Sequence, residues 1–339
     1  MKKKIIGLIV VSIILIIAMI FIADPRKLFN ILSKVNLQII IYVVLLYLIN
    51  IVFKAFRWHL LINSSGKSVS FSKNISFLMI GLMVNNTTPG RIAGEPVRVH
   101  LLNSRANVSV GRGLATIFAE RIMDLIILTT MALIGLIFIL PLIPSSDIQI
   151  LLIPFLIVIF AIVGLLYIVL HPTLLDKIIR FFVNIFNRIT KDKWSDKLEK
   201  SRESFTSSFK KGFNEILKTK KYGILCMFLT VLIWLNEAFR IYLILLALPG
   251  VSVSSFGSVL IASSAATLFG IALPGGALNA ALIAMVFTAT GIEVASATTA
   301  GILAIMTSIW LSVPLGIIAM FIVGLKIDKL AKKKQGRMN

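Results

Sequence analysis

The stretch Asn85-Asn86-Thr87-Thr88-Pro89-Gly90-Arg91 interrupts one apolar segment, and Gly270-Ile271-Ala272-Leu273-Pro274-Gly275-Gly276 interrupts another in the second half of the chain. A backbone that stops being helical inside hydrocarbon leaves N–H and C=O groups unpaired, which is energetically costly. Such breaks persist only where protein buries them or where they line a wet cavity. A matched pair of breaks therefore indicates a transport site at the bilayer midplane. The break residues that we single out are Asn85, Pro89, Gly90, Pro274, Gly275 and Gly276.

The composition is that of a polytopic membrane protein rather than a soluble domain. Of 339 residues, 58% are hydrophobic and 14% are charged. The net charge of +21 comes from Lys and Arg beside apolar segments, as the positive-inside rule predicts, so we expect anionic lipid and not nucleic acid as partner. One cysteine, Cys226, and three scattered histidines give no disulfide or metal cluster, and nucleotide and hydrolase motifs are absent from the sequence. We therefore expect no metal and no cofactor.

Apolar periodic segments predict an all-α fold, a transmembrane bundle with two broken segments. The apolar helices are expected at 5–23, 37–62, 113–140, 148–170, 222–248 and 294–324, and the broken segments at 74–102 and 254–290. Each broken segment is too short on either side of its break to cross the bilayer, so we expect re-entrant hairpins or broken crossings. The first helix resembles a signal peptide, but its apolar run is longer than usual, which favours an uncleaved helix.

Loop charges assign the two sides of the membrane. Residues 171–221 carry thirteen Lys or Arg against six Asp or Glu and are expected to be cytoplasmic, with amphipathic helices. Both termini are likewise expected in the cytoplasm of a multi-pass cell-membrane protein. The expected divisions are an N-terminal helix and external loop (1–36), a first repeat (37–140), a linking helix (141–170), the basic loop (171–221), a second repeat (222–324) and a basic tail (325–339).

The two halves repeat a short pattern. Ala-Phe-Arg ends at Arg57 and again at Arg240, an offset of 183 (240 − 57), and Pro-Gly begins at Pro89 and Pro274, an offset of 185 (274 − 89). The loop charges give the two corresponding helices opposite directions across the membrane. The sequence thus predicts an inverted-topology repeat, as in many secondary transporters, although such short matches also arise by chance.

The richest polar stretch surrounds the first break. Arg91 precedes a helix expected to begin near Gly94, and Glu95 and Arg98 lie on one face of that helix. A helix N-terminus with two guanidinium groups suits a phosphate. The alternative is that Arg91 and Arg98 reach for lipid headgroups at the interface.

A second group of charges lies inside the apolar segment 113–140. Glu120 and Asp124 share a helix face, and Arg121 lies between them in sequence. Charges at this depth are costly, so they should pair with one another or with Arg57, Arg91 or Arg98. A structural ion-pair network and a substrate site are both compatible with this pattern.

The second half carries fewer charges. Glu237 and Arg240 lie one helical turn apart in the middle of segment 222–248, where an ionisable pair favours a functional site over the alternative of a structural ion pair. The glycines of Pro274-Gly275-Gly276 would let backbone approach a ligand, or would only serve a packing kink.

These motifs resemble a known membrane family. Asn-x-x-x-Pro-x-Arg-x-x-Gly-Glu-x-x-Arg, the downstream Glu-Arg-x-x-Asp and the later Pro-Gly-Gly resemble the transmembrane flippase region of lysylphosphatidylglycerol synthase. The resemblance implies handling of lipid or lipid-linked substrates between leaflets. Members often have Gly and Glu where Leu278 and Ala281 stand, so acid chemistry at this loop is in doubt. Aminoacyl transfer is not implied, because the sequence does not show the synthase's soluble domain.

These observations predict a flippase-like translocase for an anionic headgroup, of phospholipid or polyprenyl-phosphate type. The alternatives are an intramembrane lipid-phosphate group transferase and a non-catalytic scaffold; we expect transport rather than catalysis, and the oligomeric state is not predicted. Charges from both halves should converge on one hydrated pocket. The predicted substrate-binding residues are Arg91, Glu95, Arg98, Glu120, Arg121, Asp124, Glu237 and Arg240.

Overall fold

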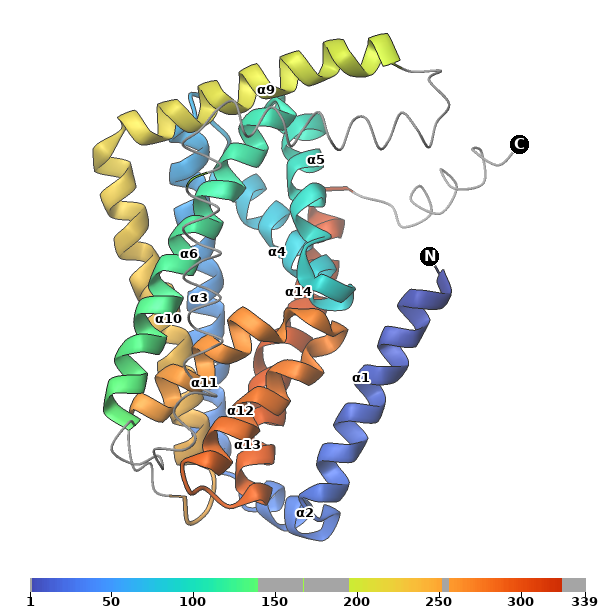
Figure 1. The fold of residues 1–339 in the computed structure, drawn as a ribbon, viewed down its shortest axis with the longest axis vertical. Coiled ribbons are helices and arrows are strands. Elements are labelled where there is room, and N and C mark those ends of the chain that lie inside the picture. The colour runs from blue at the N-terminus through green and yellow to red at the C-terminus, as the bar shows by residue number, and fades with distance from the viewer. Residues whose placement is uncertain (1, 140–166, 168–194, 252–255, 325–339) are drawn as a thin grey trace.

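A computed structural model describes residues 2–139, 167, 195–251 and 256–324, and every regular element in these ranges is helical (Figure 1). The helices are α1 (Lys2–Ile22), α2 (Pro25–Ser33), α3 (Leu37–Ser64), α4 (Phe71–Thr87), α5 (Gly94–Ala106), α6 (Val110–Ile139), α9 (Ser195–Lys218), α10 (Lys220–Ala247), α11 (Phe256–Phe269), α12 (Ala277–Ala289), α13 (Val294–Ile305) and α14 (Ser312–Ile322). The predicted all-α bundle is confirmed.

Among the described residues, four helices are long and apolar enough to cross a membrane. They are Leu37–Ser64, Val110–Phe138, Lys220–Ala247 and Val294–Ile322. The last comprises α13 and α14, joined through a π-helical turn at Met306–Trp310. The predicted multi-pass architecture is therefore confirmed, while the predicted helix at 148–170 lies outside the described residues.

The N-terminal segment is a bent pair of helices rather than a helix followed by a loop. We predicted an external loop at 24–36, but most of it is α2, which meets α1 at 85°. Asp24 makes the bend in a left-handed conformation, and its side chain accepts a hydrogen bond from the Arg26 N–H. Pro25 follows in the first turn, where its missing N–H costs nothing. A cap and a proline at N1 thus explain why the chain restarts as a helix here.

Helices α3 and α10 pack against each other and run in opposite directions (Figure 1). The buried Asn50 amide of α3 donates to the Ile233 carbonyl at 2.7 Å and to Asn236 Oδ1 at 3.1 Å, both on α10. A polar side chain in an apolar helix pairing needs such partners, because an unpaired amide costs free energy there. These bonds fix the register of the two helices that carry the Ala-Phe-Arg motifs.

The two broken segments are helical hairpins. The first joins α4 to α5 through a short 3₁₀ turn, Pro89–Arg91, and the second joins α11 to α12 through two such turns, Gly270–Ala272 and Pro274–Gly276. The first break is shorter than we predicted, because α4 continues through Thr87. The second half-helices begin at Gly94 and Ala277, as expected. Figure 1 shows the hairpins entering from opposite ends, and their turns contact each other in the middle.

The hairpin of each half packs against the last helix of the other half. Helix α4 packs on α14, the last helix of the second half, and α11 packs on α6, the last helix of the first half. Helices α6 and α13–α14 also run in opposite directions (Figure 1). Reciprocal packing of this kind is what a two-fold repeat of opposite chain direction produces, and it agrees with the predicted inverted repeat.

In each hairpin, one asparagine side chain bonds the two helices together. The asparagine is on the first helix in one hairpin and on the second helix in the other. In the first, Asn85 Oδ1 of α4 accepts from the Gly94 N–H at 2.6 Å. In the second, Asn279 of α12 donates to the Ala266 carbonyl at 2.7 Å. Added Cβ atoms at Gly94 and Gly270 would overlap their facing legs, so both hairpins close only because a glycine faces the asparagine.

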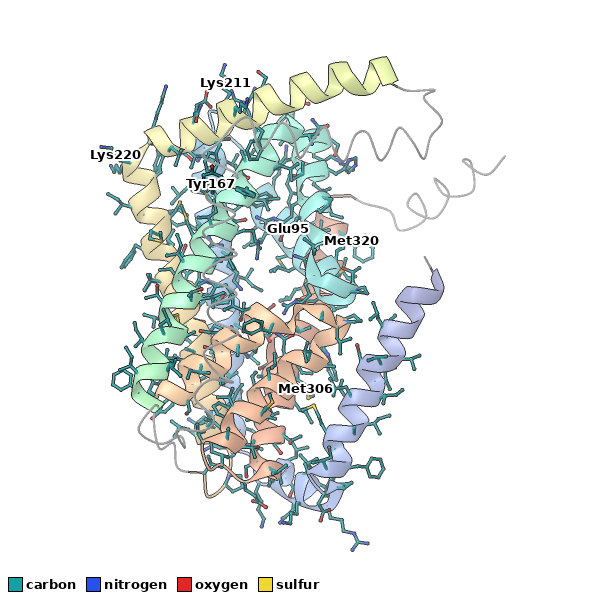
Figure 2. The ribbon with its side chains drawn as sticks, in the orientation of Figure 1. Glu95, Tyr167, Lys211, Lys220, Met306 and Met320 are labelled. Carbon is teal, nitrogen blue, oxygen red and sulfur yellow. The ribbon has the colours of Figure 1, made fainter. Side chains whose placement is uncertain are left out.

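Helix α9 packs against α6 at one end of the bundle. Phe209 and Phe213 lie against Phe118, and Arg112 pairs with Glu215 at 2.8 Å. The amphipathic helix expected within 171–221 is therefore present; the rest of that segment, up to residue 194, is outside the described residues. Figure 2 places Lys211 and Lys220 at this same end.

Candidate functional site: a charged interior between the two hairpins

Six charged side chains of the first half form a closed ring of alternating sign in the interior, which we call the ion-pair ring. Figure 2 shows Glu95 in this interior, between α6 and the first hairpin. Helix α3 contributes one member, α5 two and α6 three. In order around the ring the members are Arg57, Glu120, Arg98, Glu95, Arg121 and Asp124.

Arg57 holds one side of the ring. Its guanidinium lies 2.6 Å from Asp124 and 3.3 Å from Glu120, and it also donates to the Thr230 hydroxyl at 3.0 Å. The Trp234 N–H donates to Asp124 as well, at 2.9 Å. These contacts connect α3 and α6 to α10, so the ring joins helices of both halves.

Arg98 holds the opposite side. It pairs with Glu120 at 2.6 Å and with Glu95 at 3.0 Å, and its guanidinium lies 3.9 Å from the centre of the Trp58 ring. The spacing of Glu95 and Arg98 on α5 places both side chains on one helix face. Because Arg98 is buried with both carboxylates, its charge is fully compensated within the protein.

Arg121 closes the ring at its exposed edge. It lies 3.0 Å from Glu95 and 3.7 Å from Asp124, yet half of its side chain surface, 50%, remains exposed. Three arginines and three carboxylates make the ring electrically neutral. Removing one member of such a buried network leaves an uncompensated charge, which costs far more than the intact network gains.

A second, smaller charge pair comes from α10. Arg240, only 1% exposed, is gripped by both oxygens of Glu237 at 2.5 and 3.2 Å and donates to the Thr307 hydroxyl at 2.7 Å. Two parallel N–H···O bonds of this type fix geometry as well as charge. This pair is also neutral.

Arg91 differs from the ring arginines because its partners are uncharged. It sits in the turn of the first hairpin with a left-handed backbone, φ 47°. Its guanidinium donates to Asn86 Oδ1 at 2.8 Å and to Asn279 Oδ1 of the second hairpin at 3.5 Å. Asn86 is itself held by Ser312 at 2.7 Å. Amide oxygens orient Arg91 but leave its charge in place.

Lys54 is the other interior cation that makes no ion pair with a carboxylate within the described part of the chain. It lies one turn before Arg57 on α3, and its ammonium is 5.4 Å from the centre of the Trp234 ring. Within the described part of the chain, ion-pair distances place a carboxylate beside neither Lys54 nor Arg91. The π face of a tryptophan attracts a cation without neutralising it.

Two adjoining cavities open between these groups. One holds about 120 Å³ of water-accessible space against the ion-pair ring, and the other holds about 90 Å³ against Glu237 and Arg240. Both greatly exceed the roughly 10–15 Å³ that one water molecule needs, and both have polar walls. Lys54 and Arg91 line both cavities and stand between them.

The expected residues are gathered, but not in one pocket. Five of the eight predicted binding residues belong to the ion-pair ring and its cavity, namely Glu95, Arg98, Glu120, Arg121 and Asp124. Glu237 and Arg240 line the neighbouring cavity, and Arg91 lines both. The carboxylates pair with Arg57 and Arg98, two of the partners that we considered; Arg91, the third, does not pair with them.

Sequence reasoning did not place several lining residues in the site. Arg57 was considered only as a pairing partner, and Lys54, Asn86, Trp234 and Asn279 were not assigned. A signal for Lys54 was present in the repeat: it occupies the position that Glu237 occupies in the second half, at the offset of 183 (237 − 54). Among the described residues, groups of three or more side chains suited to a metal are not found.

Comparison with known proteins identifies a family for this chain and relatives that align with it over nearly their whole length. The family model described as the lysylphosphatidylglycerol synthase TM region matches residues 5–325. A UPF0104 membrane protein of Pyrococcus horikoshii is 26% identical over 93% of this chain and 96% of its own length. Another, of Methanothermobacter thermautotrophicus, is 27% identical over 98% of this chain and 100% of its own length. No solved structure matches the chain.

Proposed function

The chain belongs to the family of the lysylphosphatidylglycerol synthase transmembrane region, and from this premise we propose that it moves an anionic lipid headgroup across the bilayer of the cell membrane. The observation that carries the proposal is the pair of polar cavities, each large enough for water, where the two hairpins meet, with Lys54 and Arg91 lining both and making no ion pair among the described residues. An uncompensated charge in a membrane interior marks a binding pathway more often than a structural contact.

The two hairpins supply the means of access in this proposal. Irregular backbone at membrane depth is tolerated where it lines a cavity, and both breaks meet in the middle of the bundle. The hairpins enter as re-entrant segments from opposite sides, so rocking of one half against the other would open the cavities to each side in turn. With the basic segment 171–221 and both termini in the cytoplasm, the first hairpin enters from the cytoplasmic side.

In this proposal some charged residues hold the helices together and others contact the ligand. The ion-pair ring fixes α3, α5 and α6 around the cavity, and its one exposed arginine, Arg121, faces the approach to it. Arg91 and Lys54 then bind the headgroup, Arg91 through two parallel N–H donors and Lys54 as a point charge. Glu120 and Asp124 are saturated by arginines, an arrangement that favours binding over acid–base catalysis.

Lipid movement in proteoliposomes tests this proposal. Vesicles containing the purified protein and a trace of fluorescent anionic phospholipid are treated with a membrane-impermeant quencher, and the rate at which inner-leaflet lipid becomes accessible is measured. We expect Arg91→Ala and Lys54→Ala each to lower this rate by about tenfold or more, since a hydrogen bond to a charged group is worth about 1.5–3 kcal/mol.

Lys27→Ala is the matched control. Lys27 lies on α2, outside the cavity walls, in an exposed ion pair with Glu293 at the start of α13, so removing its charge should leave the rate unchanged. If both cavity variants move lipid at the wild-type rate, the proposed function is wrong.

A further inference from the structure

The charges around the two cavities do not balance. Among the described residues, the cavity walls hold six cationic and four anionic side chains, an excess of two positive charges. The cations are Lys54, Arg57, Arg91, Arg98, Arg121 and Arg240, and the anions are Glu95, Glu120, Asp124 and Glu237.

The excess can be assigned to two residues. The ion-pair ring accounts for three cations and three anions, and Glu237 with Arg240 accounts for one of each. The remaining two charges belong to Lys54 and Arg91, which contact an indole face and two amide oxygens. Both line both cavities, so one ligand between the cavities would meet the two cations together.

A charge without a counter-ion in a membrane interior is costly even at a cavity wall, and a ligand of equal and opposite charge removes that cost. A phosphate monoester carries close to two negative charges at neutral pH and offers three acceptor oxygens, whereas a phosphodiester carries one charge and two such oxygens. A guanidinium bonds two phosphate oxygens in parallel, and an ammonium meets a third. A diester would leave one of the two cations uncompensated.

We propose that the site is selective for a terminal phosphate carrying two negative charges, so that phosphomonoester lipids are bound in preference to phosphodiester lipids. This inference rests on the proposed function, which places the ligand between the two cavities. It goes further by specifying the charge of the headgroup.

Equilibrium binding by the purified protein in a neutral detergent tests the selectivity without requiring transport. The probes are dioctanoyl phosphatidic acid, a monoester, and dioctanoyl phosphatidylglycerol, a diester with the same chains, each titrated while the unfolding temperature is followed. At pH 7 we expect the monoester to bind at least about tenfold more tightly, a difference of ~1.4 kcal/mol. At pH 5 the monoester keeps only one charge, and the preference should shrink towards unity.

Inorganic phosphate is the third probe, and it separates the two sources of this chemistry. Binding of inorganic phosphate as tightly as the short-chain monoester would assign the site to free phosphate; much weaker binding would assign it to a lipid. Lys54→Gln and Arg91→Gln should each reduce the monoester preference, whereas Lys27→Gln should preserve it. The comparison of lipids at two pH values uses only the wild-type protein, so it stands even if a variant fails to fold.

The outcomes separate this inference from the proposed function. Equal affinity for both lipids at pH 7, or a preference that does not change between pH 7 and pH 5, overturns the charge selectivity even if the protein moves phosphatidylglycerol in vesicles. Selective, pH-dependent binding of phosphatidic acid by a protein that moves no lipid supports the charge selectivity and overturns translocation.

Discussion

The two halves of the bundle share a framework but differ in chemistry. Each half has a long helix containing Ala-Phe-Arg, a hairpin broken at Pro-Gly and a final long helix that packs on the hairpin of the other half. The first half carries all three carboxylates of the ion-pair ring. The final helix pair of the second half, 294–322, carries no Asp, Glu, Lys or Arg, and neither does its hairpin, 256–289.

Residues at corresponding positions of the two hairpins show which features the two halves share. At the offset of 185, Gly94 corresponds to Asn279 (279 − 94) and Asn85 corresponds to Gly270 (270 − 85), so the closing asparagine and its facing glycine have changed places. At the same offset, Glu95 corresponds to Ala280 and Arg98 to Ile283. The repeat therefore preserves the fit of the two hairpin legs, while charged residues occur in the first hairpin and not in the second.

The largest expected effect follows from breaking the ion-pair ring. Glu120 pairs with Arg57 and Arg98, so Glu120→Ala leaves two buried guanidinium groups short of a partner. We expect the free energy of unfolding to fall by about 3–5 kcal/mol. Thermal unfolding of the detergent-solubilised protein measures the loss.

The matched variant in the second half is Glu237→Ala. Glu237 serves one arginine, Arg240, which keeps its bonds to Thr307 and the Ala304 carbonyl. The loss should therefore be smaller than for Glu120→Ala. An equal or greater loss from Glu237→Ala would contradict the view that buried charge is concentrated in the first half.

A methyl group in the first hairpin tests its closure. In Gly94→Ala the new Cβ would overlap the Gly81 carbonyl oxygen, a backbone atom that no rotamer change can move aside. Overpacking typically costs about 1–3 kcal/mol, and we expect the upper end of that range. Gly223→Ala on α10 is the control, because its added Cβ meets nothing within 4 Å. Equal unfolding temperatures for the two variants would mean that the hairpin legs are not in close contact.

Sequence alone predicted the framework well because its signals are local. Breaks at Pro-Gly, a helix start at Gly94 and another at Ala277 depend on residues next to one another, and all three are observed. The extension of α4 through Thr87 was missed, since Asn and Thr are poor helix formers in isolation. Here Asn86 is held by Ser312 of α14, and the Thr87 hydroxyl donates to the Met83 carbonyl of its own helix.

The site could be predicted only in part, because the carboxylate that neutralises a given cation comes from a residue far away in the sequence. Arg57 and Lys54 lie one turn apart on α3 and look alike in sequence. The carboxylates that neutralise Arg57 come from α6, more than sixty residues away, and among the described residues no carboxylate pairs with Lys54. Which cation is left to meet a ligand therefore emerges only when the helices are assembled.

A smaller effect compares the two closing asparagines. Asn85→Ala removes the acceptor of the Gly94 N–H and one donor to Glu95, and Asn279→Ala removes the donor to the Ala266 carbonyl. We expect each to lower the free energy of unfolding by about 1–3 kcal/mol, the cost of a buried polar group left unpaired. If the exchange of Asn and Gly between the hairpins preserves one function, the two losses should be similar. A loss confined to Asn85→Ala would mean that the second hairpin is held by packing alone.

The smallest expected effect concerns a contact without a counterpart in the first half. Lys27 of α2 lies 3.2 Å from Glu293, at the start of α13, and both side chains are more than half exposed, 61% and 59%. Water and salt screen such a pair, so Lys27→Ala should change the free energy of unfolding by less than about 1 kcal/mol. Unfolding measured at low and high salt checks this, and the small difference from wild type should vanish at high salt. A loss near that of Glu120→Ala would show that α2 anchors the second half through this pair. The second half would then depend on an external charge contact as strongly as the first half depends on its internal ring.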